Sequence, residues 1–566
     1  MPDRPITTYP QRPLAVRPSD PRAVTVAARV DALVRARRPD LAVVHIGSSA
    51  VPDLPGKGVV DLGIHPPPDT DLAALRDLLA DLGFQRTTGA AAFPDSRPLF
   101  IGGLEEGGEV LPIHLHVIPD AGEWHRQIVF RDQLRADADL RARYIAVKED
   151  AVGTAPSGLQ YSFRKTAFIR GALDAAGAAE PPILPGSTIG ILGGGQLGRM
   201  LALAAHAMGY RITILDPDPA CPAAAVADEQ IVGRYDDVAA ALRLADRSDV
   251  VTYELEHVSA EAVRAVDNVR PIRPGLFTLL MTQDRLAERR FLADLGVPTA
   301  EWREVRSREE LVAGAKALGF PLRLKASVGG YDGRSQVRIE GAGEVDAAWT
   351  ALAPRAVDGL LLERELAFEQ EISVVVARDL AGRNAPYPVV RNRHDAGILV
   401  ESIAPAPGPR TMVPQAFALA DRIATALDAV GVVTIEMFQL PGAQLAVNEL
   451  APRVHNSGHW TLEGARTSQF EQHIRAICGL PLGSVEMTAQ GAAMVNLLGS
   501  GPERTARVLG AEVALRDPAA SVHLYDKRRV FERRKMGHVT VVADSTGEAL
   551  RRARTAAAAI MWADEP

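Results

Sequence analysis

Residues 432–450 read V-V-T-I-E-M-F-Q-L-P-G-A-Q-L-A-V-N-E-L. Two apolar runs, Val432 to Leu440 and Gln444 to Leu450, flank a short glycine-containing turn, which predicts a β-hairpin. Glycine at the first of two central positions suits a type II′ turn at Gly442-Ala443. In that register Glu436 lies directly opposite Glu449 on one face of the sheet, with the two Cβ atoms roughly 5 Å apart.

Two carboxylates at that distance repel each other, so both stay ionised only if a cation lies between them. A hard divalent ion held by carboxylate oxygens and nucleotide phosphates meets that demand. An exposed acid pair at a sheet edge is the alternative. Alternation along the strand points Asn448 away from the Glu449 face, unless the strand ends there. The alternative fits less well because the neighbours are apolar: Ile435, Met437, Val447 and Leu450.

A polar loop follows the hairpin, and residues 451–461 read A-P-R-V-H-N-S-G-H-W-T. So many hydrogen-bond donors directly after an acid pair suit the binding of an anionic reactant. The donors are Arg453, His455, Asn456, Ser457 and His459.

A glycine-rich loop, K-A-S-V-G-G-Y-D-G-R-S-Q at 325–336, lies between two short apolar runs. This arrangement predicts a hairpin whose tip gives backbone N–H groups to phosphate oxygens. Lys325, at the end of the incoming strand, would neutralise charge on those phosphates. A plain surface hairpin is the alternative. It is not a Walker loop, because no G-K-[ST] follows.

Another glycine motif, G-x-G-x-x-G, is formed by Gly193, Gly195 and Gly198 between an expected strand and helix, and Asp216 ends the next strand. Taken alone, this pattern is typical of a dinucleotide site in an NAD-dependent oxidoreductase. A tight strand-to-helix turn without a ligand is the alternative.

The chain has 566 residues, of which 47% are hydrophobic and 23% charged, which predicts three or four globular domains. A net charge of −7 gives no basic field for nucleic acid. Only two cysteines occur, Cys221 and Cys478, which favours a reducing compartment without disulfides. The polar N-terminus has no signal-peptide core, and no run approaches the ~18 apolar residues of a spanning helix. We therefore expect a cytoplasmic protein that does not bind a membrane.

Small residues and prolines at 175–187 predict a linker. Before it, helices and strands mix in an α+β pattern that ends in two long helices, at about 126–152 and 161–176. After it, a βαβ pattern begins with a strand at 188–192. From about residue 291 the strands become longer and antiparallel, and the C-terminal end is mostly β.

Six motifs, taken in order, resemble the N5-carboxyaminoimidazole ribonucleotide synthase (PurK) family of the ATP-grasp superfamily, from about residue 188 onward. The resemblance implies a ligase of purine biosynthesis. It would use ATP, Mg²⁺ and bicarbonate to carboxylate aminoimidazole ribonucleotide through carboxyphosphate, and family members commonly form homodimers. The motifs are I-G-I-L-G-G-G-Q-L-G-R-M (189–200), T-Y-E-L-E-H-V (252–258), Q-D-R-L (283–286), G-G-Y-D-G-R (329–334), N-E-L-A-P-R-V-H-N-S-G-H-W-T (448–461) and R-K-M-G-H-V-T (534–540).

The resemblance also implies site residues. Catalysis would involve Lys325, Arg453 and His455, and Mg²⁺ would lie on Glu436 and Glu449. ATP would be bound by Arg285, Lys325, Gly330, Tyr331, Asp332, Gly333, Arg334, Ser335, Gln336, Glu363, Arg364, Glu365, Leu366, Glu371, His394, Asn448 and Glu449. The ribonucleotide would be bound by Gly195, Gln196, Leu197, Glu254, Asn456, Ser457, Lys527, Arg534 and Lys535, the last three at its 5′-phosphate.

This sequence departs from the family pattern in three places. Ser335 stands where the family usually has glycine. The adenine-contact segment 363–366 reads E-R-E-L, and 526–529 reads D-K-R-R in place of a glycine-lysine turn.

The N-terminal third resembles the GrpB-like family, whose fold is similar to nucleotidyltransferases. The resemblance implies phosphate binding at Gly47 and Ser48 and metal binding at Asp61. The usual second acid is missing after Asp61, and His114 and His116, which alternate onto one strand face, can replace it as ligands. The motifs are H-I-G-S-S-A-V-P-D-L-P-G-K-G-V-V-D (45–61), H-L-H-V-I-P (114–119), F-R-D-Q-L-R (130–135) and Y-S-F-R-K (161–165).

We therefore expect a multidomain α/β and α+β protein. Its parts would be a nucleotidyltransferase-like GrpB domain (1–174), a linker (175–187), a Rossmann-like pre-ATP-grasp domain (188–290), an ATP-grasp domain (291–478) and a small β-rich C-terminal domain (479–566). Three other hypotheses stay open. They are a different ATP-grasp ligase such as a formate-dependent ribonucleotide transformylase, an NAD-binding oxidoreductase, and an N-terminal part that is only a binding module.

Overall fold

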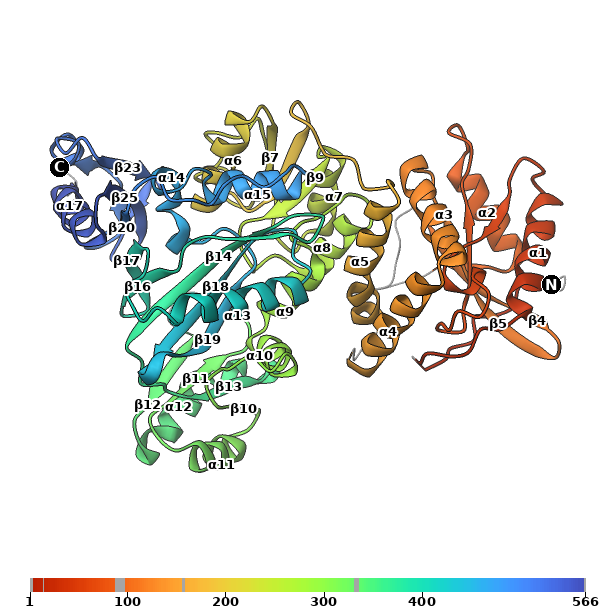
Figure 1. Cartoon of the computed structure of the whole chain (residues 1–566), viewed down its shortest axis with the longest axis horizontal. Helices are drawn as coiled ribbons and strands as arrows, with labels where there is room; N and C mark the ends of the chain where they lie inside the picture. The colour runs from red at the N-terminus through yellow and green to blue at the C-terminus, as the bar shows by residue number, and fades with distance from the viewer. Residues whose placement is uncertain (1–3, 14, 87–96, 155–157, 330–334, 564–566) are drawn as a thin grey trace. The chain divides into compact units, whose positions relative to one another are not determined.

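The computed structural model describes residues 4–13, 15–86, 97–154, 158–329 and 335–563. The chain divides into two compact units, Met1–Pro181 with Arg264–Val269 and Pro182–Val263 with Arg270–Pro566 (Figure 1). Within the described residues, no helix has both the length and the apolar character that crossing a membrane requires. Cys221 and Cys478 are buried free thiols, as expected.

The N-terminal unit is built on a five-stranded mixed sheet with the order β1-β2-β5-β4-β3. Its central strands β2 and β5 run parallel, while β4 and β5 form an antiparallel hairpin. This sheet confirms the expected α+β pattern. The strands are β1 (Val43–His45), β2 (Val60–Ile64), β3 (Gln85–Arg86), β4 (Leu99–Glu106) and β5 (Glu109–Val117).

The two faces of this sheet differ in chemistry. Helices α1 (Arg22–Arg35) and α2 (Leu72–Leu82) pack on one face, where Leu62 and Ile113 are fully buried in the same apolar core as the helices. Side chains alternate along each strand, so the residues between those apolar positions point to the opposite face. Helix α3 (Ala121–Ala136) crosses that second face, because a Cβ added at Gly63 would meet the Trp124 ring at 2.7 Å.

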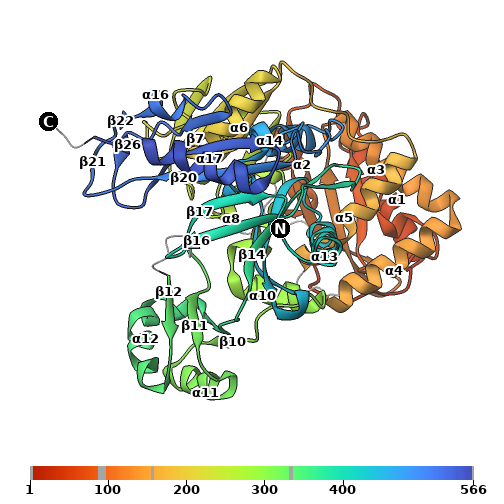
Figure 2. The ribbon, with the colours of Figure 1, turned by 60° about the vertical axis from the view of Figure 1, so that its left-hand side comes forward.

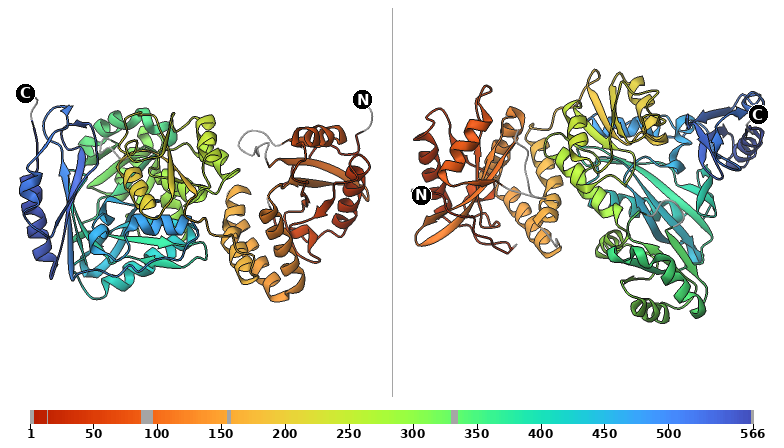
Figure 3. Two further views of the ribbon diagram at one scale, coloured as in Figure 1. Left: turned by 90° about the horizontal axis from the view of Figure 1, so that it is seen from above. Right: turned by 180° about the vertical axis from the view of Figure 1, so that it is seen from behind.

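The long helix expected at 126–152 is wrong as a single element. The chain breaks at Asp137, where φ is −112° and ψ is 111°, between α3 and α4 (Ala138–Thr154). The Asp137 carboxylate accepts a hydrogen bond from the Leu140 N–H at 2.9 Å, as an N-cap aspartate does. Helix α5 (Gly158–Ala175) then packs against α4 (Figure 3).

The larger unit starts with a four-stranded parallel sheet of order β8-β7-β6-β9, which confirms the βαβ pattern. Ile189, Ile191 and Leu201 are fully buried between the sheet and α6. The elements from residue 188 to residue 294 are β6 (Thr188–Leu192), α6 (Gln196–Ala207), β7 (Arg211–Asp216), β8 (Glu229–Val232), α7 (Val238–Asp246), β9 (Val250–Tyr253), α8 (Ala260–Asp267), α9 (Leu276–Gln283) and α10 (Arg285–Asp294). The last residues of α8 are counted with the N-terminal unit.

A small antiparallel sheet follows, with the order β10-β13-β11-β12. Its strands β11 and β12 pair Lys325 with Gln336, which confirms the hairpin expected for the glycine-rich loop. Residues 330–334 of the tip lie outside the described residues. The elements are β10 (Trp302–Val305), α11 (Arg308–Leu318), β11 (Leu322–Ala326), β12 (Gln336–Ile339), α12 (Val345–Leu352) and β13 (Leu360–Arg364).

Nine antiparallel strands form the largest sheet, with the order β19-β18-β14-β16-β17-β20-β25-β23 and β15 beside β14. The strands from the C-terminal end of the chain join it through the β17–β20 pairing (Figure 2). The strands are β14 (Gln370–Arg378), β15 (Asn384–Pro386), β16 (Val390–Asp395), β17 (Ile398–Ala404), β18 (Gly431–Leu440), β19 (Gln444–Ala451), β20 (Gly491–Leu498), β23 (Ala520–Leu524) and β25 (Lys535–Ala543). The main helices beside it are α13 (Met412–Ala426), α15 (Gln469–Ile477) and α17 (Thr546–Ala559).

Candidate active site

The β18–β19 hairpin has a different turn from the expected one. Leu440 pairs with Gln444, so three residues, Pro441–Ala443, form the turn. The two-residue type II′ turn at Gly442-Ala443 is therefore wrong. It would pair Pro441 with Gln444, and proline has no N–H to donate to the ladder.

A β-bulge at Asn448 restores the expected pairing of the acids. Met437 pairs with Val447, but the next residue back, Glu436, pairs with Glu449. Asn448 is the extra residue, so alternation is interrupted and its side chain lines the same cavity as Glu449. The opposed acid pair is confirmed, and the expectation that Asn448 points to the other face is wrong.

The acid pair lies in a cavity of about 620 Å³ between the small sheet and the largest sheet. Every described residue expected to bind ATP or the metal lines it: Arg285, Lys325, Ser335, Gln336, Glu363, Arg364, Glu365, Leu366, Glu371, His394, Asn448, Glu436 and Glu449. The expected contacts Gly330, Tyr331, Asp332, Gly333 and Arg334 lie outside the described residues.

The cavity also has lining residues that the sequence analysis missed. Arg289 lies four residues after Arg285 on α10. Residues at that spacing share a helix face, so the sequence could have indicated that Arg289 lines the same site. The others come from strands and loops whose alignment around the cavity depends on the folded chain: Ala300, Arg323, Phe368, Ile372, Ala396, Gly397, Met437, Phe438 and Val447.

Lys325 is held in place by a buried ionic network. Its ammonium pairs with Glu363, and an Nη of Arg289 lies 3.2 Å from the same carboxylate. Burial opposes ionisation of Glu363, but Lys325 and Arg289 hold the pKa of that carboxyl at about 2. Burial also lowers the pKa of Lys325, against the field of Glu363. The Glu363 side chain, expected at the adenine, is thus engaged with the lysine.

The two opposed acids have different surroundings. Burial, and then the charge of Glu449, raise the pKa of Glu436. Glu449 is also buried, but Arg285, whose Nη1 lies 3.1 Å from it, and Lys325 lower its pKa. Glu449 is therefore the more readily ionised of the two acids. Glu436 needs a neighbouring cation to be ionised at the same time.

Two histidines border the acid pair. Nε2 of His455 lies 3.2 Å from Glu436, and its Nδ1 lies 2.9 Å from the Ser457 hydroxyl. His394 pairs with Glu371, and despite burial this hydrogen bond helps to raise the pKa of His394. Both rings are thus held in fixed orientations, His394 in the wall of the cavity and His455 beside Glu436.

The remaining polar residues of loop 451–461 are engaged with the protein. Nε of Arg453 lies 2.9 Å from the buried Glu256 carboxylate. Asn456 exchanges two side-chain hydrogen bonds with Asn496, at 2.6 and 3.2 Å. The Ser457 hydroxyl accepts a hydrogen bond from Ser373 at 2.9 Å. The contacts of Asn456 and Ser457 fix the loop against the large sheet.

The first glycine turn binds a carboxylate of the protein itself. Glu254 accepts hydrogen bonds from the N–H groups of Gly195 and Gly198 at the start of α6, at 2.6 Å from Gly198. Asp216, the acid of the dinucleotide pattern at the end of β7, accepts a hydrogen bond from the Gly194 N–H at 2.7 Å. The donors that would bind a pyrophosphate are occupied, so this turn does not have the form of an NAD site.

A basic cluster lies beside this turn. Nζ of Lys527 donates to Gln196 Oε1 at 2.8 Å and to the Lys535 carbonyl at 2.7 Å. Burial and the nearby cations lower the pKa of Lys527 to about 7, and burial lowers that of Lys535 to about 8. Arg534 contributes a third charge, and together they suit an anion. Leu197, by contrast, is buried in the core, so a substrate would reach only its backbone.

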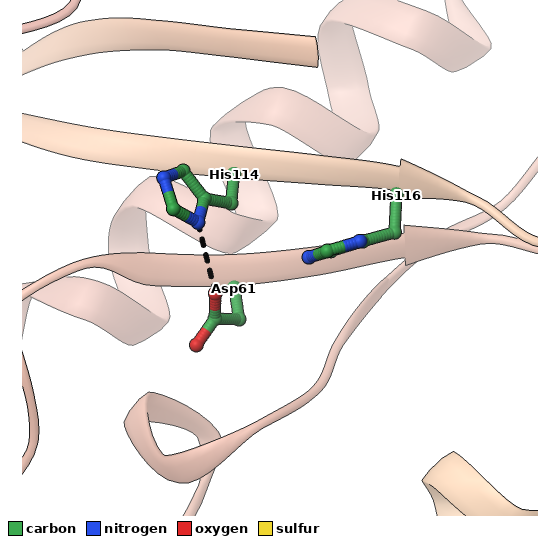
Figure 4. A group of neighbouring side chains, drawn as sticks. All are labelled: Asp61, His114 and His116. Atoms are coloured by element: carbon green, nitrogen blue, oxygen red, sulfur yellow. Dashed lines mark ion pairs between the residues drawn. The ribbon is translucent and has the colours of Figure 1, made fainter. Parts of the chain in front are cut away.

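The N-terminal unit also brings its expected residues together. Asp61 and His114 are register partners on the parallel strands β2 and β5, and Figure 4 shows His116 on the same side of β5. Gly47, with φ +66°, lies so close that a Cβ there would be 2.7 Å from Asp61 Oδ2. The Ser49 hydroxyl accepts a hydrogen bond from the Asp61 N–H at 3.1 Å. Phosphate binding by Gly47 and Ser48 stays a prediction.

Four family models match the chain. They are the ribonucleotide synthetase preATP-grasp domain at 187–283, the ATP-grasp domain at 290–470, the phosphoribosylaminoimidazole carboxylase C-terminal domain at 492–552, and the GrpB protein at 13–175. These matches confirm both resemblances and the multidomain α/β fold.

Known proteins match the larger part of the chain. The N5-carboxyaminoimidazole ribonucleotide synthase of Brucella melitensis is 44% identical over 362 residues, which are 64% of this chain and 98% of that protein. The Aspergillus clavatus enzyme complexed with ATP is 34% identical, with a TM-score of 0.61 over 65% of this chain and 97% of that one. Its complex with ADP and 5-aminoimidazole ribonucleotide is 33% identical, with a TM-score of 0.60 and the same coverage.

These relatives and the occupied glycine turn do not favour the oxidoreductase or transformylase hypotheses. The chain belongs to the N5-carboxyaminoimidazole ribonucleotide synthase family of ATP-dependent ATP-grasp ligases, and it carries a GrpB domain in its N-terminal unit.

Proposed function

We propose that the larger unit carboxylates 5-aminoimidazole ribonucleotide with bicarbonate and ATP, giving the N5-carboxy product, ADP and phosphate. The observation that carries this proposal is the opposed pair of Glu436 and Glu449 in a cavity that also holds Lys325 and Arg285. Two acids for a metal ion and two cations for phosphates thus meet in one place. The names of the relatives and the ligands in the Aspergillus clavatus structures support the same reaction.

ATP would lie along the cavity from an apolar end to a charged end. Leu366, Ile372, Met437 and Phe438 offer an apolar surface for the adenine ring. Glu371, oriented by its pairing with His394, is placed to accept hydrogen bonds from ribose hydroxyls. The triphosphate would then point towards Lys325, Arg285 and the acid pair.

Glu436 and Glu449 fit a hard divalent ion such as Mg²⁺. Their carboxylates face each other, and the Asn448 amide lines the same wall. Burial and the charge of Glu449 raise the pKa of Glu436, an effect that a bound cation would oppose. Bound there, Mg²⁺ would offset the charge on the phosphate oxygens during phosphoryl transfer.

In the first step, a bicarbonate oxygen would bond to the γ-phosphorus of ATP as the bond to the β–γ bridging oxygen breaks. Carboxyphosphate and ADP result. Lys325, held by Glu363, and Arg285, held by Glu449, would keep the transferred oxygens in place. In the second step, the bond between the carboxyl carbon and the phosphate oxygen of carboxyphosphate would break to give CO₂ and phosphate. The exocyclic amine of the aminoimidazole would bond to the CO₂ carbon and lose a proton to the phosphate, with Arg453 and His455 limiting access of water.

The ribonucleotide would be anchored by its 5′-phosphate. Lys527, Arg534 and Lys535 supply the positive charge, and Lys527 is linked to the glycine turn through Gln196. Glu254 keeps that turn in shape by capping α6.

ADP release by the purified chain tests this proposal. We expect release that requires both bicarbonate and aminoimidazole ribonucleotide. Release only with formate and glycinamide ribonucleotide would overturn the proposal in favour of a transformylase. The homodimer and the cytoplasmic location stay predictions.

A further inference from the structure

We propose that Asp61, His114 and His116 of the N-terminal unit bind a divalent transition-metal ion of the zinc and iron(II) class, with open positions that accept an oxyanion. Among the residues that the structure describes, this is the one group of three or more histidine, cysteine, aspartate or glutamate side chains whose ligand atoms all lie within 4.8 Å of one another. The site is separate from the proposed carboxylase site and does not depend on it.

The backbone places the three side chains on one face of the sheet. Parallel pairing of β2 with β5 sets Asp61 beside His114 and Gly63 beside His116. Because strand residues two apart share a face, both imidazoles and the carboxylate project to the same side. Figure 4 shows the His116 ring extending towards the space beside Asp61 and His114.

The spacing of the ligand atoms suits an ion more than a direct contact. Nδ1 of His114 lies 3.7 Å from Asp61 Oδ1, which is longer than a hydrogen bond. Two donors bound to one tetrahedral zinc ion are ~3.4 Å apart, as follows from bonds of about 2.0–2.1 Å. Small side-chain rotations would bring the third donor, from His116, to that separation.

Contacts with Tyr9 hold the His114 ring in an orientation that suits a metal ligand. Its Nε2 lies 3.1 Å from the Tyr9 hydroxyl, and the two rings stack with centroids 5.5 Å apart. When Nε2 donates its proton to Tyr9, the Nδ1 lone pair is directed at the space shared with Asp61. A histidine that binds a metal through one nitrogen commonly donates a hydrogen bond from the other.

Two imidazoles and one carboxylate select the class of metal. Mg²⁺ and Ca²⁺ prefer sets of oxygen ligands, whereas imidazole suits zinc, iron, nickel and copper. The side chains of Asp61 and His114 keep 28% and 29% of their exposure, so an ion there has room for water or a further ligand.

Lysines make an oxyanion the natural further ligand. The charges of Lys57, Lys148 and Lys165 all act on the Asp61 carboxylate, so the three ammonium groups lie in its neighbourhood. Lys148 is buried, with Nζ over the Tyr144 ring at 4.7 Å, and Lys57 and Lys165 are half-buried. A metal ion added to this group raises the positive charge further, which favours binding of a phosphate-like anion.

Titration with cobalt(II), used as a spectroscopic probe of the proposed site, gives a direct test. The full chain, stripped with a chelator, is titrated with Co²⁺ and followed by visible absorption and equilibrium dialysis. We expect a ligand-field band with one equivalent of Co²⁺, which persists in the Glu449→Gln variant. Asp61→Asn and His116→Gln should each weaken binding at least ~100-fold, since even outer-shell changes cost 10–100-fold. His125→Gln, an exposed histidine on α3 of the same unit, is the matched control.

Inorganic phosphate tests the anion. It should shift the cobalt band, and Lys57→Ala should require at least ~10-fold more phosphate for the same shift, since a charge-assisted contact is lost. Wild-type protein that shows no band, or a band unchanged in both Asp61→Asn and His116→Gln, would overturn the metal site. Because the two variants remove different ligands, misfolding of one leaves the other decisive. A cobalt band that phosphate does not move would overturn the anion site.

Discussion

Glu436 on β18 lies directly opposite Glu449 on β19, and one extra residue, Asn448, sets that pairing. The pairs from Leu440–Gln444 to Met437–Val447 share one register, and continuing that register would place Glu436 opposite Asn448. With the bulge, both Asn448 and Glu449 reach the cavity that holds Lys325. The site therefore depends on a local irregularity of the sheet as well as on the identity of the acids.

Replacing Glu449 should abolish carboxylation with little effect on the fold. We expect Glu449→Ala to lower turnover at least ~100-fold, because offsetting charge during phosphoryl transfer is worth several kcal/mol. Bicarbonate-dependent ADP release measures the effect. Glu486→Gln, which removes an exposed acid paired with Arg466, is the control and should keep wild-type turnover. Wild-type turnover in Glu449→Ala would contradict the metal role.

Deleting Asn448 should lower turnover much less than replacing Glu449. Without the extra residue, Glu449 follows Val447 directly in a regular ladder, so it still lies opposite Glu436 on the same face of the sheet. Asn448→Ala also removes the amide from the cavity but keeps the bulge, so we expect both variants to lose turnover to a similar, moderate extent. A loss for the deletion as large as that for Glu449→Ala would mean that the bulge itself is needed and not only the pairing of the acids. Circular dichroism on both variants checks that the sheet is retained.

The Lys325–Glu363 pair should make stability depend on pH. The pKa of Glu363 is about 2 in the fold, below its ordinary value, so its stabilising effect is present above pH ~4.5 and is lost as pH falls towards 2. Glu363→Gln leaves Lys325 buried without its counter-ion, which costs about 3–5 kcal/mol. We expect melting temperatures of wild type and variant to differ most at neutral pH and to converge below pH ~4.5. A difference that stays constant down to acid pH would contradict this.

The basic cluster should bind the ribonucleotide less well as pH rises. With pKa values of about 7 for Lys527 and about 8 for Lys535, both lysines lose charge between neutral and mildly alkaline pH. The KM for aminoimidazole ribonucleotide should therefore rise over this range, while the KM for ATP changes little. Lys527→Arg keeps the charge and should flatten the rise. Arg528→Ala, an exposed neighbour, is the control. An equal rise in the KM for ATP would contradict a phosphate role for this cluster.

Short-range features could be read from residue order. The Glu436–Glu449 pairing and the Lys325–Gln336 hairpin each join residues close in the chain, where strand alternation and turn chemistry act over a few bonds. Two local details were nevertheless predicted wrongly. The turn is longer than expected because Pro441 lacks an N–H, and a helix ends at Asp137 because this residue caps the next helix.

Long-range partners needed the folded chain. Lys527 bonds to Gln196, which is 331 positions away in the chain. Glu254 accepts hydrogen bonds from the N–H groups of a turn whose sequence resembles a dinucleotide site. Glu363, expected at the adenine, pairs with Lys325. Residue types and spacings determine which chemical groups the chain can offer to a site and how neighbouring side chains alternate along a strand. Packing of distant strands and helices determines which of them meet, because burial leaves a charged group stable only beside a partner, and no local rule names that partner.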